Sequence, residues 1–248
     1  MRRENLKVTI HCRSAGMETT STTLMWWLLA MLAYPEVQTR AQAELDEVVG
    51  RARPPTFADV PSLPYIRAMA KEALRWSPVA PLGVPHASTE DDWYDGMFIP
   101  KGTIIFPNMR VLNSEPEVFG SNGADFDPAR YLDENGQVKN LMEAREEGHV
   151  TFGFGRRGCP GKYVTEGTLV IDFATMLWAM RFERPQGSQG ELDVRDYDLS
   201  GLTAYAFLRT LCWARTNWPA QSPRAFRVQD GPPLHGGRNF AERGVEYV

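Results

Sequence analysis

The sequence predicts a mainly α-helical fold with small β-sheets, and three observations support this class. Apolar residues recur at helical spacing, over lengths that exceed ordinary strands, in residues 15–33, 35–49, 64–76 and 163–181. Residues 97–106 instead read as two short β-rich runs around a Pro-Lys-Gly turn, which predicts a hairpin. With 248 residues, of which 43% are hydrophobic, the chain can also bury a substantial core.

Charge and cysteine content exclude several kinds of partner. The net charge of −4 provides no global basic field, so we expect no nucleic acid. The three cysteines, Cys12, Cys159 and Cys212, contain no close pair, which argues against a disulfide framework and a Cys-rich zinc site. The most apolar run, residues 24–33, is well short of the ~20 residues that span a bilayer. We therefore expect no membrane span in this chain, and the charged start leads into no signal peptide.

The first expected helix begins at residue 15 and is apolar nearly all round, so it should be buried. Trp26 and Trp27 would expose a large apolar patch if one face of this helix lacked a packing partner. Residues 1–14 look atypical beside it, and residues 5–11 are compatible with a short strand.

Threonines at positions 19, 20, 22 and 23 are poor helix formers, and together with Gly16 they suggest a local opening of the helical backbone. The simpler alternative is a helix start capped by Ser14 or Thr20.

Two further helices follow. Pro35 suits the first turn of the second helix, and Gly50 ends it. The third helix, residues 64–76, contains Glu72 and Arg75 three residues apart, which ordinarily indicates a solvated pair worth a few tenths of a kcal/mol.

The segments between and after the helices are mostly irregular. Residues 78–86 are Pro-rich and extended, and residues 133–148 are polar and loop-like. Beyond the helix at 163–181, residues 201–208 and 222–228 read as strands, and residues 209–221 look like an insertion. The Gly- and Pro-rich residues 230–248 are expected to be disordered.

One cysteine lies on a glycine-rich loop, residues 152–161, that reads Phe-Gly-Phe-Gly-Arg-Arg-Gly-Cys-Pro-Gly. A lone cysteine is usually a small buried hydrophobe. Here the glycines allow close approach to a flat ligand, and Arg156, Arg157 and the following helix start would stabilise a thiolate. Cys159 is therefore a candidate iron ligand.

The loop meets the pattern Phe-x-x-Gly-x-Arg-x-Cys-x-Gly at Phe152, Gly155, Arg157, Cys159 and Gly161, and thus resembles the cytochrome P-450 family of haem-thiolate monooxygenases. The resemblance implies that Cys159 is the proximal ligand of haem b iron, which favours O–O cleavage. Phe152 would then pack beside the thiolate. Arg157 would reach a haem propionate, as would His86, although a lone histidine is as often a surface residue.

Other stretches match this family in the same order. Ala-Gly-Met-Glu-Thr-Thr at residues 15–20 is similar to the oxygen-binding segment, which implies proton delivery to dioxygen by Glu18 and Thr19. Glu72 and Arg75 match the Glu-x-x-Arg pair, and Arg130 would complete their cluster, which is buried in the family. The residues implied to line the substrate pocket are Ala15, Val79, Ala80, Leu82, Gly83, Val84, Leu202 and Thr203.

By this resemblance, residues 15–229 look like the carboxyl-terminal haem-binding half of a fungal-like P-450 monooxygenase of secondary metabolism. Such an enzyme inserts one oxygen atom of O₂ into a small apolar organic substrate, with NADPH electrons supplied by a flavoprotein reductase. Full-length relatives are expected on the cytosolic face of the endoplasmic reticulum. Two alternatives remain: a truncated, non-catalytic chain that at most binds haem, and a haem enzyme that rearranges hydroperoxides. Members of the latter type typically lack the threonine found here at position 19.

Overall fold

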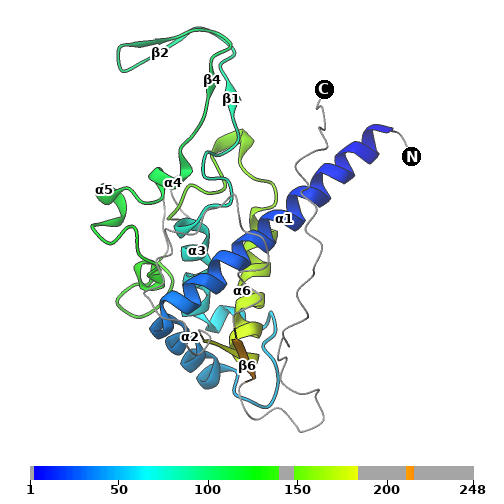
Figure 1. The fold of residues 1–248 in the computed structure, drawn as a ribbon, viewed down its shortest axis with the longest axis vertical. Coiled ribbons are helices and arrows are strands. Elements are labelled where there is room, and N and C mark those ends of the chain that lie inside the picture. The colour runs from blue at the N-terminus through cyan, green and yellow to red at the C-terminus, as the bar shows by residue number, and fades with distance from the viewer. Residues whose placement is uncertain (1–2, 140–147, 184–210, 215–248) are drawn as a thin grey trace, which may run out of the picture.

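A computed structural model describes residues 3–139, 148–183 and 211–214 (Figure 1). Its long helices are α1 (Arg3–Ala33), α2 (Pro35–Val48), α3 (Pro64–Trp76) and α6 (Lys162–Ala179). Shorter turns of helix are α4 (Met109–Leu112), α5 (Pro116–Phe119) and the 3₁₀ segments η1 (Val60–Ser62), η2 (Pro128–Tyr131) and η3 (Gly155–Arg157). Within the described ranges, no helix combines the length and apolarity needed to cross a membrane.

The described strands form three separate two-stranded antiparallel sheets. Their strands are β1 (His86–Ala87) with β4 (Ile104–Ile105), β2 (Asp92–Tyr94) with β3 (Met97–Ile99), and β5 (Met180–Glu183) with β6 (Leu211–Ala214). Long helices with small sheets confirm the predicted fold class. The first two sheets form an arm that extends away from the helices (Figure 1).

The hairpin expected over residues 97–106 is wrong in its pairing. Met97–Ile99 pairs with the preceding strand, Asp92–Tyr94, across Asp95 and Gly96, whose φ angles are 48° and 77°. Asp-Gly accepts two consecutive left-handed positions, which a tight two-residue hairpin turn requires. Ile104–Ile105 pairs instead with His86–Ala87, so the Pro-Lys-Gly turn lies within the arm and does not join two paired strands.

Helix α1 also differs from expectation. It runs without a break from Arg3 to Ala33, so residues 5–11 are helical and neither Ser14 nor Thr20 begins the helix. The expected opening at the threonines is absent from this unbroken helix. The hydroxyls of Thr19, Thr22 and Thr23 donate to the carbonyl oxygens four residues earlier, at 2.6, 2.8 and 3.0 Å, so each is satisfied within the helix.

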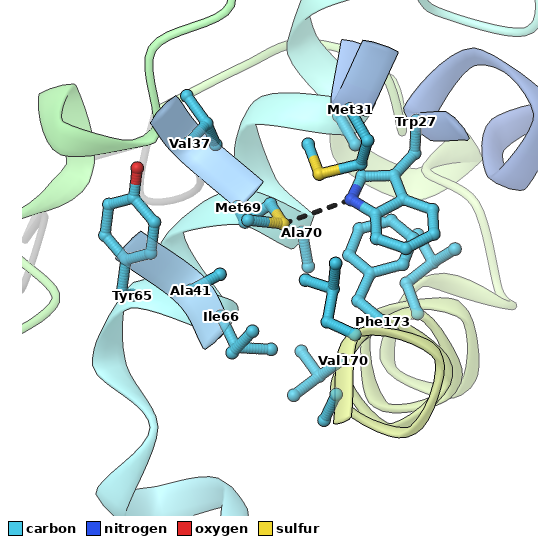
Figure 2. Packing of buried hydrophobic residues seen from close by; sticks show 14 of the residues in the cluster. Trp27, Met31, Val37, Ala41, Tyr65, Ile66, Met69, Ala70, Val170 and Phe173 are labelled. Atoms are coloured by element: carbon cyan, nitrogen blue, oxygen red, sulfur yellow. Dashed lines mark hydrogen bonds between the residues drawn. The ribbon is translucent and has the colours of Figure 1, made fainter. Parts of the chain in front are cut away.

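The core lies where α1, α2, α3 and α6 meet (Figure 2). Trp27 of α1 is fully buried, stacks on Phe173 of α6 with ring centroids 4.1 Å apart, and donates through Nε1 to the Met69 sulfur of α3 at 3.0 Å. Trp26 is 4% exposed and meets Trp76 edge to face. The apolar patch expected at the two tryptophans is therefore wrong, because the other helices cover both rings.

Two buried glutamines of α2 hold the end of α6. Gln38 exchanges two hydrogen bonds with the backbone of Phe182, at 3.0 and 2.7 Å. The Gln42 amide donates to the carbonyl oxygens of Leu177 and Met180, at 3.2 and 2.8 Å. These contacts accompany the change from helix to strand at Met180, two residues before the helix end expected from the sequence.

The end of the chain is described only in part. Leu211–Ala214, inside the segment expected to be an insertion, pairs with β5 in register from Met180 to Glu183. Residues 201–208, 222–228 and 230–248 lie outside the described residues, as do the pocket candidates Leu202 and Thr203. The boundaries proposed for these segments, and for residues 1–14, stay predictions.

Candidate functional site

Three charged side chains form a buried ion cluster. Glu72 and Arg75 lie on the inward face of α3 because their spacing places them one above the other. Arg75 donates from Nε and one terminal nitrogen to the two carboxylate oxygens of Glu72, both at 2.7 Å, and Arg130 of η2 donates to Glu72 at 3.0 Å. Since the Glu72 and Arg75 side chains are 0% and 1% exposed, the alternative of a solvated surface pair is wrong.

The rest of the Arg75 guanidinium is satisfied by backbone carbonyl groups. It donates to the oxygens of Asn113 and Gly123, both at 2.6 Å, and to that of Asp125 at 2.9 Å. Gly123 is needed for this approach, because an added Cβ would lie 2.8 Å from the Ser114 oxygen. One buried cation thus orders two separate loops around the end of α3.

The cysteine loop turns through η3 and closes on itself. Gly153 and Gly155 adopt φ angles of 70° and 59°, in the left-handed region that favours glycine. The Cys159 N–H donates to the Phe152 oxygen at 2.8 Å, which ties the two ends of the loop together. The Cys159 side chain is exposed.

The surroundings of Cys159 fit a thiolate ligand to a flat cofactor. Its sulfur lies 3.8 Å from the position of a Cβ built on Gly161, the N-cap residue directly before α6, so it sits at a helix N-terminus. Arg156 and Arg157 are exposed on the same loop. A Cβ added at Gly153 or Gly155 would meet nothing within 4 Å, so this side of the loop is open.

The other predicted site residues lie on different elements. Ala15, Glu18 and Thr19 are exposed on α1, and the Thr19 hydroxyl donates to the Ala15 oxygen. His86 is exposed in β1. The structure thus places these residues on elements separate from the cysteine loop.

The predicted pocket segment before β1 is largely exposed. Ala80, Leu82 and Val84 face solvent, and Val79 is half-buried. Gly83 has a φ of 60°, and a Cβ there would lie 2.5 Å from Pro107 Cγ, so this position requires glycine.

Two buried residues beside the cysteine loop were missed by the sequence reasoning. Asn113 is 1% exposed and follows α4. His149 is 6% exposed, its ring lies 5.6 Å from that of Phe152, and its Nδ1 accepts from the Thr151 N–H at 3.4 Å. Neither belongs to a motif, so the only available signal was position: His149 stands three residues before the loop pattern begins.

Burial governs the ionisation of His149. It lowers the pKa of the imidazole to about 3, and the positive charges of Lys71 and Arg75 act in the same direction. The ring is therefore neutral, and because Nδ1 accepts, the proton is on Nε2. This Nε2 has no hydrogen-bond partner among the described residues.

Comparisons with known proteins show the family of the chain. The family model for cytochrome P450 matches residues 1–200, a range that includes the first fourteen residues. The chain is 55% identical over 189 residues to a cytochrome P450 monooxygenase of Armillaria gallica, which covers 76% of this chain and 36% of the relative. A second such protein of that fungus is 50% identical over 177 residues, covering 71% and 34%.

A cytochrome P450 monooxygenase of Postia placenta is 49% identical over 176 residues, covering 71% of this chain and 33% of the relative. The chain spans about a third of the length of these curated relatives. Because the family model matches most of the chain, the chain belongs to the cytochrome P450 family.

Proposed function

We propose that this chain supplies the haem-thiolate site of a monooxygenase that inserts one oxygen atom of O₂ into a small apolar organic substrate. Electrons come from NADPH through a flavoprotein reductase, and the complete enzyme works on the cytosolic face of the endoplasmic reticulum. The observation that carries the proposal is the exposed sulfur of Cys159, on a closed glycine loop at the start of α6.

The residues of the loop have distinct tasks in this proposal. Cys159 would provide a thiolate to haem b iron, and the open backbone at Gly153 and Gly155 would leave room for the flat macrocycle. Arg157 and His86 would bind the propionates, and Phe152 would pack beside the sulfur. When bound, the haem would supply O₂ activation, which a thiolate ligand promotes.

Proton delivery falls to α1. The Glu18 carboxyl would relay a proton to the Thr19 hydroxyl, which would release its bond to the Ala15 oxygen in order to donate toward dioxygen. The presence of Thr19 favours monooxygenation over the rearrangement of hydroperoxides. Apolar side chains hold the substrate, namely Ala15, Val79, Ala80, Leu82 and Val84, with Gly83, Leu202 and Thr203 beside them.

The test uses a chimera in which this chain follows the amino-terminal part of the Armillaria gallica relative. We expect the haem-loaded chimera to give the red-shifted thiolate-type Soret band of a ferrous carbonyl complex, and Cys159→Ser to abolish it, because a hydroxyl is not a thiolate donor. Cys12→Ser and Cys212→Ser are matched controls and should keep the band. A band that survives Cys159→Ser would show that the ligand is elsewhere.

A further inference from the structure

Asn113 connects the ion cluster to the segment that leads into the cysteine loop. Its backbone oxygen accepts from Arg75 at 2.6 Å. Its side-chain oxygen accepts from the Val150 N–H and its side-chain nitrogen donates to the Thr151 hydroxyl, both at 2.9 Å. One buried residue thus holds α3 through its main chain and residues 150–151 through its amide.

Thr151 makes the second connection. Its hydroxyl accepts from Asn113 and donates to the Leu74 carbonyl oxygen at 2.7 Å. Leu74 lies in the last turn of α3, where carbonyl groups have no partner within the helix. The hydroxyl therefore satisfies the end of α3 and fixes the backbone just before Phe152.

Backbone hydrogen bonds connect these residues to the cysteine. The Val150 oxygen accepts from the Gly153 N–H at 2.9 Å, and the Phe152 oxygen accepts from the Cys159 N–H at 2.8 Å. Both ends of the loop are thus held at Phe152. Residues 150–151 are held by Asn113, Leu74 and the His149 ring, and the Tyr131 hydroxyl donates to the Gly148 oxygen just before them at 3.1 Å. Movement of residues 150–151 would tilt the backbone that presents the sulfur.

We propose that Asn113 and Thr151 form a positioning clamp, which transmits the rigidity of the buried ion cluster to the loop and so keeps Cys159 in the direction needed for iron ligation. The proposal rests on the proposed function and adds two residues that lie outside the five positions of the loop pattern. Neither touches the cofactor; both act through Val150 and Phe152. Loss of either leaves buried polar groups unpaired, so the loop should shift.

The test compares variants of Thr151 in the haem-loaded chimera. Thr151→Val keeps the shape but removes the hydroxyl, and Thr151→Ser keeps the hydroxyl. We expect the rate at which the thiolate-type carbonyl band disappears to rise about fivefold in Thr151→Val and to stay unchanged in Thr151→Ser. A change of about fivefold corresponds to the free energy of one ordinary hydrogen bond. Thr39→Val removes an exposed hydroxyl bond to Pro35 on α2 and should leave the rate unchanged.

Asn113→Ala provides an independent test. It should accelerate the loss of the band to a similar degree, and it should also speed hydrogen exchange of the Val150 amide, which loses its acceptor. Combined with Thr151→Val it should add little, since both changes open the same clamp. Thermal unfolding is measured in parallel, because a role in stability alone predicts a lower unfolding temperature with an unchanged rate of band loss.

The outcomes separate the two proposals. If Cys159→Ser abolishes the band but Thr151→Val and Asn113→Ala lose it at the original rate, the clamp is wrong and the haem-thiolate function stands. Failure of Thr151→Ser to restore the rate also overturns the clamp, because the hydroxyl would then not be the operative group. If the band survives Cys159→Ser, the proposed function fails, and with it the role of the clamp in iron ligation.

Discussion

His149 is buried at the base of the cysteine loop, and its surroundings disfavour a charge on the ring. Burial is the main cause of the lowered pKa, and Lys71 and Arg75 add repulsion. In the unfolded chain the same ring titrates near 6.5. Unfolding at acid pH therefore takes up a proton that the folded protein excludes, so His149 couples folding of the loop region to pH.

This coupling predicts a loss of stability in acid. Because the folded pKa is depressed, the contribution of His149 is complete above pH 6.5 and falls as the pH approaches about 3. At pH 5 the loss should be about 2 kcal/mol. His149→Leu removes the titrating ring. Its free energy of unfolding, measured with denaturant and compared with that of the original chimera, should therefore rise by that amount between pH 7.5 and pH 5. The same change at exposed His86 is the control, and an equal gain there would contradict the prediction.

Helix α3 is the element to which the site is attached, and it is held at both ends. At its start, the two Glu44 carboxylate oxygens of α2 accept from the N–H groups of Tyr65 and Ile66 at 2.8 and 3.0 Å, where helix N–H groups lack partners. At its end, the Thr151 hydroxyl and the ion cluster satisfy Leu74 and Arg75. Its position is thus fixed by groups from three other parts of the chain.

Arg75→Ala should destabilise the attachment of α3. Removal of one partner leaves Glu72 as an uncompensated buried charge and several carbonyl groups unpaired, which typically costs ~3 to 5 kcal/mol. Denaturant unfolding of the chimera measures the loss, and haem incorporation should fail with it. The control is Arg53→Ala, which breaks the bidentate pair with Asp59 at the surface and should have a much smaller effect. An Arg75→Ala protein that keeps the original free energy of unfolding and still incorporates haem would contradict a stabilising role for the cluster.

At the scale of the molecule, apolar exposure is concentrated on the arm. Trp93, Tyr94, Met97 and Ile104 are between 60% and 69% exposed, whereas Trp26, Trp27 and Trp178 of the helices are buried. Exposed apolar side chains gathered on one part of a molecule favour a covering partner or association. Among the described residues, the arm is therefore a part that would gain from something packed against it.

The 248-residue chain alone should accordingly associate, bind apolar dyes and give no stable thiolate-type carbonyl band. Phe98→Lys together with Ile104→Lys should reduce both association and dye binding, because charge on a sheet face opposes stacking. Tyr163→Lys, at a more exposed site on α6, is the control and should change neither. Light scattering and dye fluorescence measure the effect. A monomeric chain that binds no dye and turns over substrate would disprove this and exclude the non-catalytic alternative.

The sequence alone determined the features that depend on local patterns. Helical periodicity located α2, α3 and α6 to within one or two residues, since apolar spacing and a leading proline act over a single turn. The five-position loop pattern identified the family, and the spacing of Glu72 and Arg75 placed both on one helix face. The Asp95-Gly96 turn was also available locally, and its omission led to the wrong hairpin.

Only the tertiary structure decided which distant groups meet. Thr151 lies 77 residues from Leu74 and 38 from Asn113, so no local pattern joins them. Coverage of Trp26 and Trp27, and the pairing of β1 with β4 and of β5 with β6, likewise depend on elements far apart in the chain. Local periodicity indicates that a face is apolar or that a polar group needs a partner; which group satisfies it is set by how the whole chain packs.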